Sequence, residues 1–187
     1  MPKDRELVLV SLLQEATRIA NEADDIAGAG LPVIRAVCAA TGWSAGHLCL
    51  PDPRDRRVFV STDIWYEDDP GSFAGLRAAI EGFRFTFGGG IVGQAARSGR
   101  PVWSPDVTKD GNFIRSPLAG ALDGVGAAIA FPVIARGVAS AVLEFFTHEP
   151  VEPDARLLEI MADVGIQLGR VADRMAASQA LRWPPPT

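Results

Sequence analysis

The side chains of this 187-residue chain that could do chemistry are few. Its only histidines are His47 and His148, and its only cysteines are Cys38 and Cys49. A serine triad would need one of the histidines beside a serine, and a zinc site would need at least three ligands, more than these scattered residues supply. The glycine-rich segment 88–93 (GGGIVG) lacks the lysine of a phosphate-binding loop. The sequence therefore predicts no catalytic residues, no metal site and no enzymatic activity.

Two polar side chains fall on predicted strands that are otherwise apolar. Strand alternation puts His47 and Cys49 on one face of the strand at 45–50, and it fixes the face of Glu144 in the strand at 138–147. A carboxylate is costly to bury without a partner. Glu144 is therefore either an internal hydrogen-bond partner that holds a neighbouring loop or a group that binds a ligand. His47 is either a packing residue or a ligand of haem or a metal.

The segment 85–113 (FTFGGGIVGQAARSGRPVWSPDVTKDGNF) is the most informative stretch of the chain. It predicts a strand end, a sharp turn at three glycines, a short helix with an apolar face, a short strand and a long polar loop. An apolar helix that leads into a polar loop above a sheet indicates a lid over a small-molecule pocket. The segment therefore predicts a place that holds a ligand.

The lid and the strands that face it contain the candidate ligand-binding residues. In the alternative interpretation, Trp103 and Phe113 are packing residues. Asp106 then caps a turn, and Arg115 is solvated. The candidates are His47, Trp65, Trp103, Asp106, Asn112, Phe113, Arg115 and Glu144. Those expected to border one volume between the sheet and the segment 88–122 are His47, Trp65, Trp103, Phe113 and Glu144.

Composition excludes several classes of protein. The formal charge of −5 and the lack of clustered Lys and Arg argue against nucleic acid as a partner. No apolar stretch reaches the roughly 18–20 residues that span a bilayer, and the N-terminus lacks the apolar core of a signal peptide. The two cysteines follow no metal or Cys-x-x-Cys spacing, so we expect reduced, buried thiols. The sequence predicts a cytoplasmic protein that binds neither nucleic acid nor a membrane.

Hydrophobic periodicity predicts the order of helices and strands. Helices are expected at 5–23, 31–40, 70–82, within the lid segment, and from Pro153-Asp154 onward. Strands are expected at 45–50, 57–65, 83–87, 102–103, 127–134 and 138–147. This order predicts an α+β fold, with the terminal helices on one face of an antiparallel sheet and the lid on the other. The expected boundaries are an N-terminal amphipathic helix at 1–24, a domain at 25–176 and a linker or chain end at 177–187.

The C-terminal helix carries apolar residues in alternating steps of four and three. Such a pattern is typical of a coiled-coil seam, and over this length it is also typical of a stripe that faces the protein's own core. Both interpretations stay open here. The first predicts a homodimer in which this seam and the N-terminal helix form a parallel bundle. The seam residues are Leu157, Met161, Val164, Leu168, Val171 and Met175.

Several short motifs occur together in a fixed order. They are 38–47 (CAATGWSAGH), Trp65, 88–93 (GGGIVG), 98–103 (SGRPVW), Asp106 with Asn112-Phe113, 130–132 (AFP), 142–146 (VLEFF) and 167–171 (QLGRV). Because these motifs occur together in this order, the chain resembles a GAF domain of bacterial signalling proteins. The resemblance extends from about Leu9 to Met175. The similar subtype stands upstream of histidine kinase, diguanylate cyclase or phosphodiesterase domains. The resemblance implies a six-stranded antiparallel sheet with a helical layer behind it and a ligand pocket in front.

The resemblance also implies a function. It is that of a sensor domain in a cytoplasmic signalling protein, such as a two-component system, which relays ligand state through the C-terminal helix to an output domain in a longer chain. The resemblance identifies no ligand and no cofactor. Asn112-Phe113 only echoes the cyclic-nucleotide signature Asn-Lys-Phe-Asp-Glu. Cys38 and Cys49 match neither the position nor the neighbour of a bilin-binding cysteine, nor do they supply the cysteine set of the GAF-fold reductase of free methionine sulfoxide.

Two alternative functions stay open at this point. The first is a ligand-free dimerisation or spacer module whose pocket is filled by its own side chains. The second is a redox or gas sensor that binds haem through His47.

Overall fold

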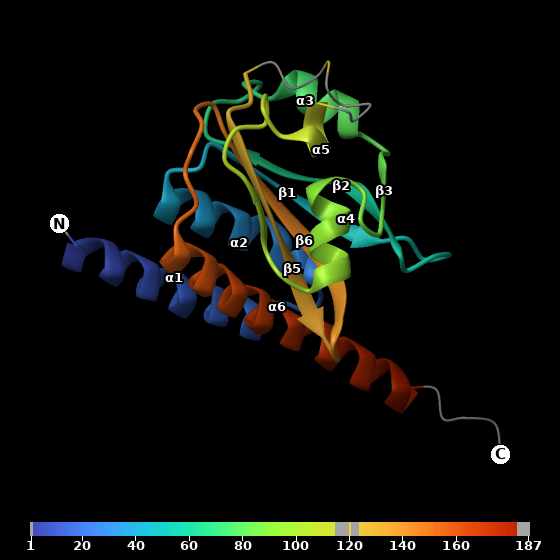
Figure 1. Cartoon of the computed structure of the whole chain (residues 1–187). Helices are drawn as coiled ribbons and strands as arrows, with labels where there is room; N and C mark the ends of the chain where they lie inside the picture. The colour runs from blue at the N-terminus through green and yellow to red at the C-terminus, as the bar shows by residue number, and fades with distance from the viewer. Residues whose placement is uncertain (1, 115–119, 121–123, 183–187) are drawn as a thin grey trace.

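The computed structural model describes residues 2–114, 120 and 124–182 of the chain. These residues form an α+β fold in which helices cover both faces of a six-stranded sheet (Figure 1). The order across the sheet is β3-β2-β1-β6-β5-β4, and neighbouring strands pair antiparallel. The predicted fold class is confirmed. The strands are β1 (Ala45–Pro51), β2 (Val58–Glu67), β3 (Arg84–Thr86), β4 (Val102–Ser104), β5 (Ala127–Ala135) and β6 (Val138–Thr147).

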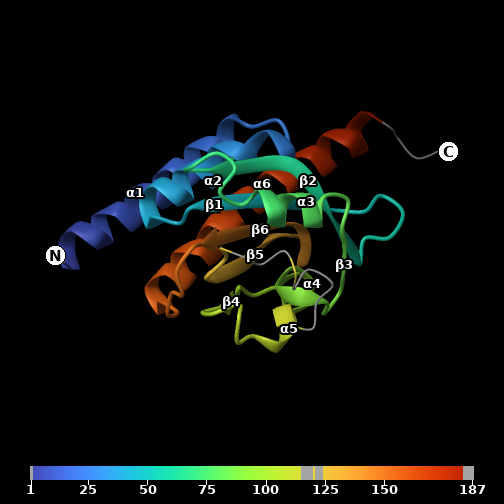
Figure 2. The ribbon, with the colours of Figure 1, turned by 90° about the horizontal axis from the view of Figure 1, so that it is seen from above.

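The helices divide between the two faces. Figure 2 shows α1 and α2 on one side of the sheet and α4 and α5 on the other. None of the described helices combines the length with the apolar composition that a transmembrane span requires. The helices are α1 (Pro2–Glu22), α2 (Ile26–Thr41), α3 (Ala74–Ile80), α4 (Gly90–Ser98), α5 (Gly111–Ile114) and α6 (Ala155–Arg182).

Each face of the sheet has its own hydrophobic core. On β6, Leu143 and Phe145 belong to the core that α1, α2 and α6 cover, which we call the helix-facing core. Val142 and Phe146 belong to the core that α3 and α4 cover, which we call the lid-facing core. The alternation of side chains along β6 is therefore the one that the sequence predicts, and both faces of the sheet are covered.

Two predicted helices differ in extent from the observed ones. The helix expected at 31–40 begins at Ile26, because the Asp25 carboxylate accepts a hydrogen bond of 2.7 Å from the Gly28 amide and so caps an earlier turn. Pro32 consequently lies inside the helix and not in its first turn. The helix expected at 70–82 is reduced to α3.

The glycines before α4 adopt the sharp turn that the sequence predicts. Gly88 and Gly90 have φ angles of 88° and 57°, in the left-handed region that side chains disfavour. The turn aims α4 back across the sheet, so its apolar face, with Ile91 and Val92, packs into the lid-facing core.

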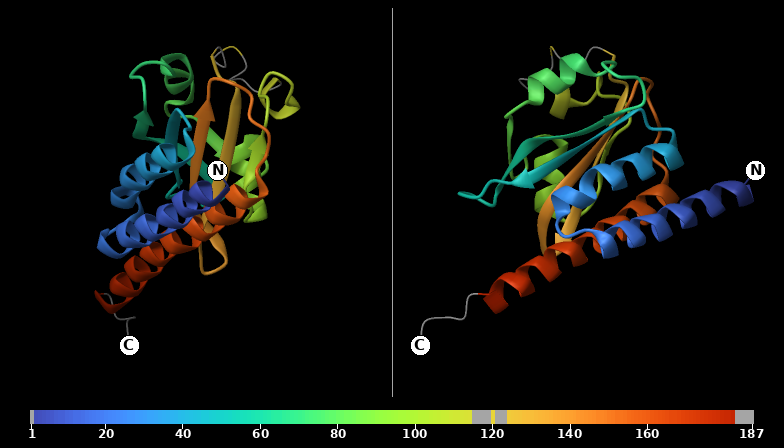
Figure 3. Two further views of the ribbon diagram at one scale, coloured as in Figure 1. Left: turned by 90° about the vertical axis from the view of Figure 1, so that its left-hand side faces the viewer. Right: turned by 180° about the vertical axis from the view of Figure 1, so that it is seen from behind.

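Helices α1 and α6 run parallel and side by side along the helix-facing side (Figure 3). Glu6 near the start of α1 pairs with Arg156 near the start of α6, at 2.5 Å. Near the far ends, the Arg174 guanidinium donates to the carbonyl oxygens of Ala20 and Ala23. These contacts hold the two helices in one register along most of their shared length.

The seam of α6 lies mostly inside the chain, which corrects its interpretation as an intermolecular contact. Leu157, Met161, Val164, Leu168 and Val171 are buried in the chain's own helix-facing core, each at most 5% exposed. The physical reason is that β5 and α1 cover this stripe of α6, so no second chain is needed to bury it. Met175, one turn beyond, is half-buried. Of the two interpretations of the heptad pattern, the core-facing stripe is the one that the structure shows.

Candidate ligand-binding site

The lid-facing side of the sheet holds a buried pair of polar side chains. His47 on β1 lies directly opposite Glu144 on β6, and its Nδ1 is 3.2 Å from Glu144 Oε2. The two residues are 0% and 3% exposed. The structure thus places both residues on the predicted face and gives the Glu144 carboxylate the partner that its burial requires.

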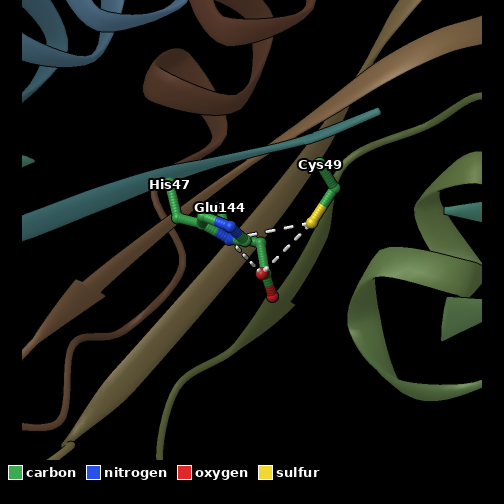
Figure 4. A group of neighbouring side chains, drawn as sticks. All are labelled: His47, Cys49 and Glu144. Atoms are coloured by element: carbon green, nitrogen blue, oxygen red, sulfur yellow. Dashed lines mark hydrogen bonds and ion pairs between the residues drawn. The ribbon is translucent and has the colours of Figure 1, made fainter. Parts of the chain in front are cut away.

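Cys49 completes this cluster (Figure 4). Its Sγ is 3.7 Å from His47 Nδ1 and 3.8 Å from Glu144 Oε2, and the thiol donates to the carboxylate. Burial, and then the charge of Glu144, raise the pKa of the Cys49 thiol well above its ordinary value. The thiol is therefore protonated at neutral pH. We call His47, Cys49 and Glu144 the polar cluster.

A shift in strand pairing shapes the surroundings of the imidazole. His47 lies opposite Trp65, whereas Cys49 lies opposite Ser61, so three residues of β2 face one residue of β1 in between. Irregular pairing of this kind often re-aims side chains beside functional sites. Here Ser61 Oγ comes to 3.0 Å from His47 Nε2. The Trp65 ring stacks on the imidazole with its centre 4.4 Å away.

Trp65 connects the polar cluster to the protein surface. The guanidinium of Arg77 on α3 lies 5.9 Å from the centre of the Trp65 ring. Both residues line an open groove of about 340 Å³ beside α3. Trp65 therefore lines this groove and also stacks on His47, which makes it the residue that links the buried cluster to the groove.

Trp103 was predicted to border the same volume, and that prediction is wrong. It lies on the opposite side of the sheet, where its ring makes an edge-to-face contact with Trp43 at 5.1 Å. Its Nε1 donates to the Val151 carbonyl at 2.9 Å. The physical reason is the register of β4, which sets Trp103 opposite Ile129, a residue of the helix-facing core.

The remaining candidates on the loop fall into different surroundings. Phe113 is 8% exposed and packs in the lid-facing core. Asp106 accepts hydrogen bonds from the Thr108 amide at 3.0 Å and pairs with Lys109 at 2.7 Å, and the hydrogen bond from Lys109 lowers the pKa of its carboxyl most. Asp106 thus stabilises a local turn. Asn112 lies in α5.

Part of the predicted lid is not described. The side chain of Asn112, the candidate Arg115 and the lid residues at 115–119 and 121–123 lie outside the described residues. Of the residues expected to border one volume, the structure places four on the lid-facing side of the sheet: His47, Trp65, Phe113 and Glu144.

The possible metal ligands are scattered along the sequence, which predicts no metal site. The fold nevertheless brings three of them together. The donor atoms of His47, Cys49 and Glu144 all lie within 4.8 Å of one another. The signal available in the sequence was the two-residue spacing of His47 and Cys49 on one strand face, together with a carboxylate on another strand. Only the pairing of β1 with β6 joins them.

The sequence also contains one pattern with the spacing of a catalytic motif. The segment 42–46 (GWSAG) has the Gly-x-Ser-x-Gly spacing of a nucleophile elbow. In that elbow the serine sits on a turn from a strand to a helix. Here Ser44 follows α2 and precedes β1, which is the reverse order, so the segment does not form the elbow.

Comparison with known proteins gives one family. The model of the GAF domain matches residues 11–167. No curated protein matches the chain.

Solved structures with similar folds include GAF domains and an enzyme. The GAF domain of a phosphoenolpyruvate-protein phosphotransferase from Coxiella burnetii is 19% identical, with a TM-score of 0.72 over 93% of this chain and 98% of that one. The free methionine-R-sulfoxide reductase from Neisseria meningitidis is 18% identical, with a TM-score of 0.70 over 91% of each chain. The GAF domain of the Acinetobacter phosphoenolpyruvate-protein phosphotransferase is 15% identical, with a TM-score of 0.68 over 91% of this chain and 96% of that one. At these identities the likeness shows the fold.

Proposed function

The chain belongs to the GAF domain family, and on that premise we propose that it senses a small molecule at the polar cluster and regulates an output domain. GAF domains are generally small-molecule sensor or regulatory domains. The observation that carries the proposal is the burial of His47 and Glu144 side by side on the lid-facing side. Polar side chains that a protein buries in an otherwise apolar layer fix the orientation of a ligand in most small-molecule sites.

A route from the cluster to α6 supports the relay part of the proposal. Glu144 pairs with Ala130 of β5, and β5 is the strand on which α6 packs. The approach is close: a Cβ on Gly169 would lie 1.9 Å from the Ile134 carbonyl oxygen. Because the helix backbone rests on the strand backbone there, a shift of β5 would displace α6 rather than be absorbed by side chains.

We propose a regulatory role without catalysis. The polar cluster holds a thiol whose pKa is raised, whereas a nucleophilic cysteine needs a lowered pKa. The buried Cys38 thiol also has a pKa raised to about 12, chiefly by burial. Neither thiol is therefore prepared for attack on a substrate.

A ligand-free spacer module is the second candidate, and one observation favours it. The imidazole of His47 has a partner at each nitrogen, with Glu144 at Nδ1 and Ser61 at Nε2. A cluster that satisfies itself in this way can also be structural. The same observation counts against haem ligation by His47, because a haem iron, whose equatorial ligands come from the porphyrin, would have to displace one of these partners.

A homodimer remains part of the proposal, with a different contact surface. The α6 seam is occupied within the chain, so the contact would have to use exposed apolar side chains such as Leu7, Val8 and Val10 of α1, which are 65%, 42% and 39% exposed. Light scattering at high micromolar protein concentration measures the oligomeric state directly. A monomer at that concentration would contradict the proposed dimer.

A thermal-shift screen of nucleotides, carboxylates and aromatic compounds tests the sensor function. A ligand present at 100 times its dissociation constant should stabilise the wild type by about 2.7 kcal/mol. We expect Glu144→Gln to lose most of this stabilisation, because the amide cannot present a charged acceptor at the site.

Glu149→Gln is the matched control, because Glu149 is exposed on the loop that follows β6. It should keep the full ligand response. Equal responses from Glu144→Gln and Glu149→Gln would place the ligand elsewhere. A complete lack of response to any compound, with metal ions also tested, would favour the spacer module.

A further inference from the structure

We propose that His47, Cys49 and Glu144 bind one divalent transition-metal ion, with Zn²⁺, Co²⁺ and Fe²⁺ as the class of cation that fits. The inference deepens the proposed sensor function and rests on it, because it states what the same face of the sheet binds. The three side chains offer a nitrogen, a sulfur and an oxygen donor, and they converge on one point from β1 and β6 (Figure 4).

The spacing of the donor atoms fits a tetrahedral ion. With metal–ligand bonds of about 2.0–2.3 Å, tetrahedral geometry sets neighbouring donors about 3.3–3.8 Å apart. The observed separations are 3.2 Å for Nδ1 to Oε2, 3.7 Å for Sγ to Nδ1 and 3.8 Å for Sγ to Oε2. An ion could therefore enter with side-chain shifts of a few tenths of an ångström, roughly the tolerance of such sites.

The charge of the donors matches a divalent cation. A thiolate and a carboxylate carry two negative charges, and a neutral imidazole adds none, so a bound M²⁺ leaves the buried site neutral. On binding, the Cys49 S–H bond breaks, its proton leaves to solvent, and a sulfur–metal bond forms. Neutrality is decisive here, because all three residues are buried and an uncompensated charge would be costly.

The neighbours of His47 prepare its ring for a metal. Ser61 Oγ, 3.0 Å from Nε2, can accept the Nε2–H and so leave the Nδ1 lone pair directed at Cys49 and Glu144. Metal-binding histidines commonly donate their second ring N–H to such a partner. The stacked Trp65 ring, 4.4 Å away, fixes the plane of the imidazole.

The number of protein ligands indicates an open coordination position. Structural zinc sites use four protein ligands, whereas three leave a place for water or another small ligand. The mixed nitrogen, sulfur and oxygen set disfavours Mg²⁺ and Ca²⁺, which require oxygen donors. A small anion or neutral molecule that occupies the fourth coordination position would then be the signal that the domain senses. Trp65 lies between the metal site and the groove beside α3 from which such a molecule would enter.

Cobalt titration of chelator-treated protein tests the inference. We expect one Co²⁺ per chain, with thiolate-to-cobalt charge-transfer absorption in the near ultraviolet and the intense visible bands of tetrahedral cobalt, both removed by one equivalent of Zn²⁺. Cys49→Ser should abolish the charge-transfer absorption, and Glu144→Gln should weaken Co²⁺ affinity at least tenfold. Ser61→Ala should weaken it by about 10- to 100-fold, as loss of a partner behind a metal ligand does.

Cys38→Ser is the matched control, because Cys38 is the other buried thiol and is not part of the cluster. It should leave the cobalt spectrum unchanged, and circular dichroism serves to check that each variant is folded. Folded wild-type protein without the charge-transfer band, or a band that survives in Cys49→Ser, overturns the inference. If an organic compound stabilises the metal-free wild type through Glu144 while cobalt gives no such band, the sensor function stands and the metal site does not.

Discussion

Leu168→Glu together with Val171→Glu is expected to unfold the protein. The two side chains are 1% and 0% exposed in the helix-facing core, between α6, α1 and β5. An unpaired buried charge costs several kcal/mol, and a domain's whole stability is only about 5–15 kcal/mol. Far-UV circular dichroism and the elution volume from a sizing column should show loss of the native state.

Ile166→Glu serves as the control on the same helix. Ile166 is 51% exposed, so a carboxylate there stays in water and the fold should be kept. The contrary result for the double variant would be a folded, soluble monomer obtained from a dimeric wild type. It would mean that the seam joins two chains and that α6 does not rest on its own sheet.

Glu144→Leu in metal-free protein is expected to lower the free energy of unfolding by about 1–3 kcal/mol, because it leaves the buried His47 ring without its hydrogen-bond partner at Nδ1. His47→Leu should cost a similar amount by stranding the Glu144 carboxylate. The double variant His47→Leu/Glu144→Leu should lose less than the sum, since two apolar side chains of similar volume need no polar partners.

Urea denaturation of the four proteins measures this coupling. The expected interaction energy is about 1–3 kcal/mol. Additive effects within about 0.5 kcal/mol would contradict it and would show that the two side chains do not depend on each other. Gln at Glu144 is unsuitable for this cycle, because the amide still accepts a hydrogen bond.

The sheet and the face on which its polar residues lie could be predicted from the sequence, because both depend on the alternation of side chains along a strand, with a period of two residues. Alternation along 138–147 predicts the face of Glu144, and alternation along 45–50 predicts the face of His47 and Cys49. Both strands are long enough for the pattern to be unambiguous. That the two strands are neighbours follows from the topology, which the local pattern does not contain.

The position of Trp103 could not be predicted in this way. Strand β4 has only three residues, so its sequence holds too short a pattern to show which side faces the lid. The face is decided by pairing with β5, which sets Trp103 opposite Ile129. The shift in pairing that brings Ser61 to His47 is equally invisible in sequence, because it adds residues to one strand without a glycine or proline to mark them.

The α6 pattern could not decide between its two interpretations for a different physical reason. A heptad spacing of apolar residues and a stripe with the 3.6-residue helical period diverge by only about 20° per heptad. Over the stretch from Leu157 to Met175 the two are nearly the same. The glycines at 165 and 169, which let α6 approach β5, were the local sign of packing against the chain's own sheet.

Native mass spectrometry of the protein, purified without chelator, tests most directly whether the polar cluster binds a small species. Wild type and Glu149→Gln are expected to carry the same additional mass, that of a metal ion alone or with a small molecule. Glu144→Gln, folded by circular dichroism, should show the mass of the bare chain. Bare-chain mass for the wild type after exposure to Zn²⁺ and the ligand screen, or an unchanged adduct in Glu144→Gln, would contradict the assignment of this cluster as the binding site.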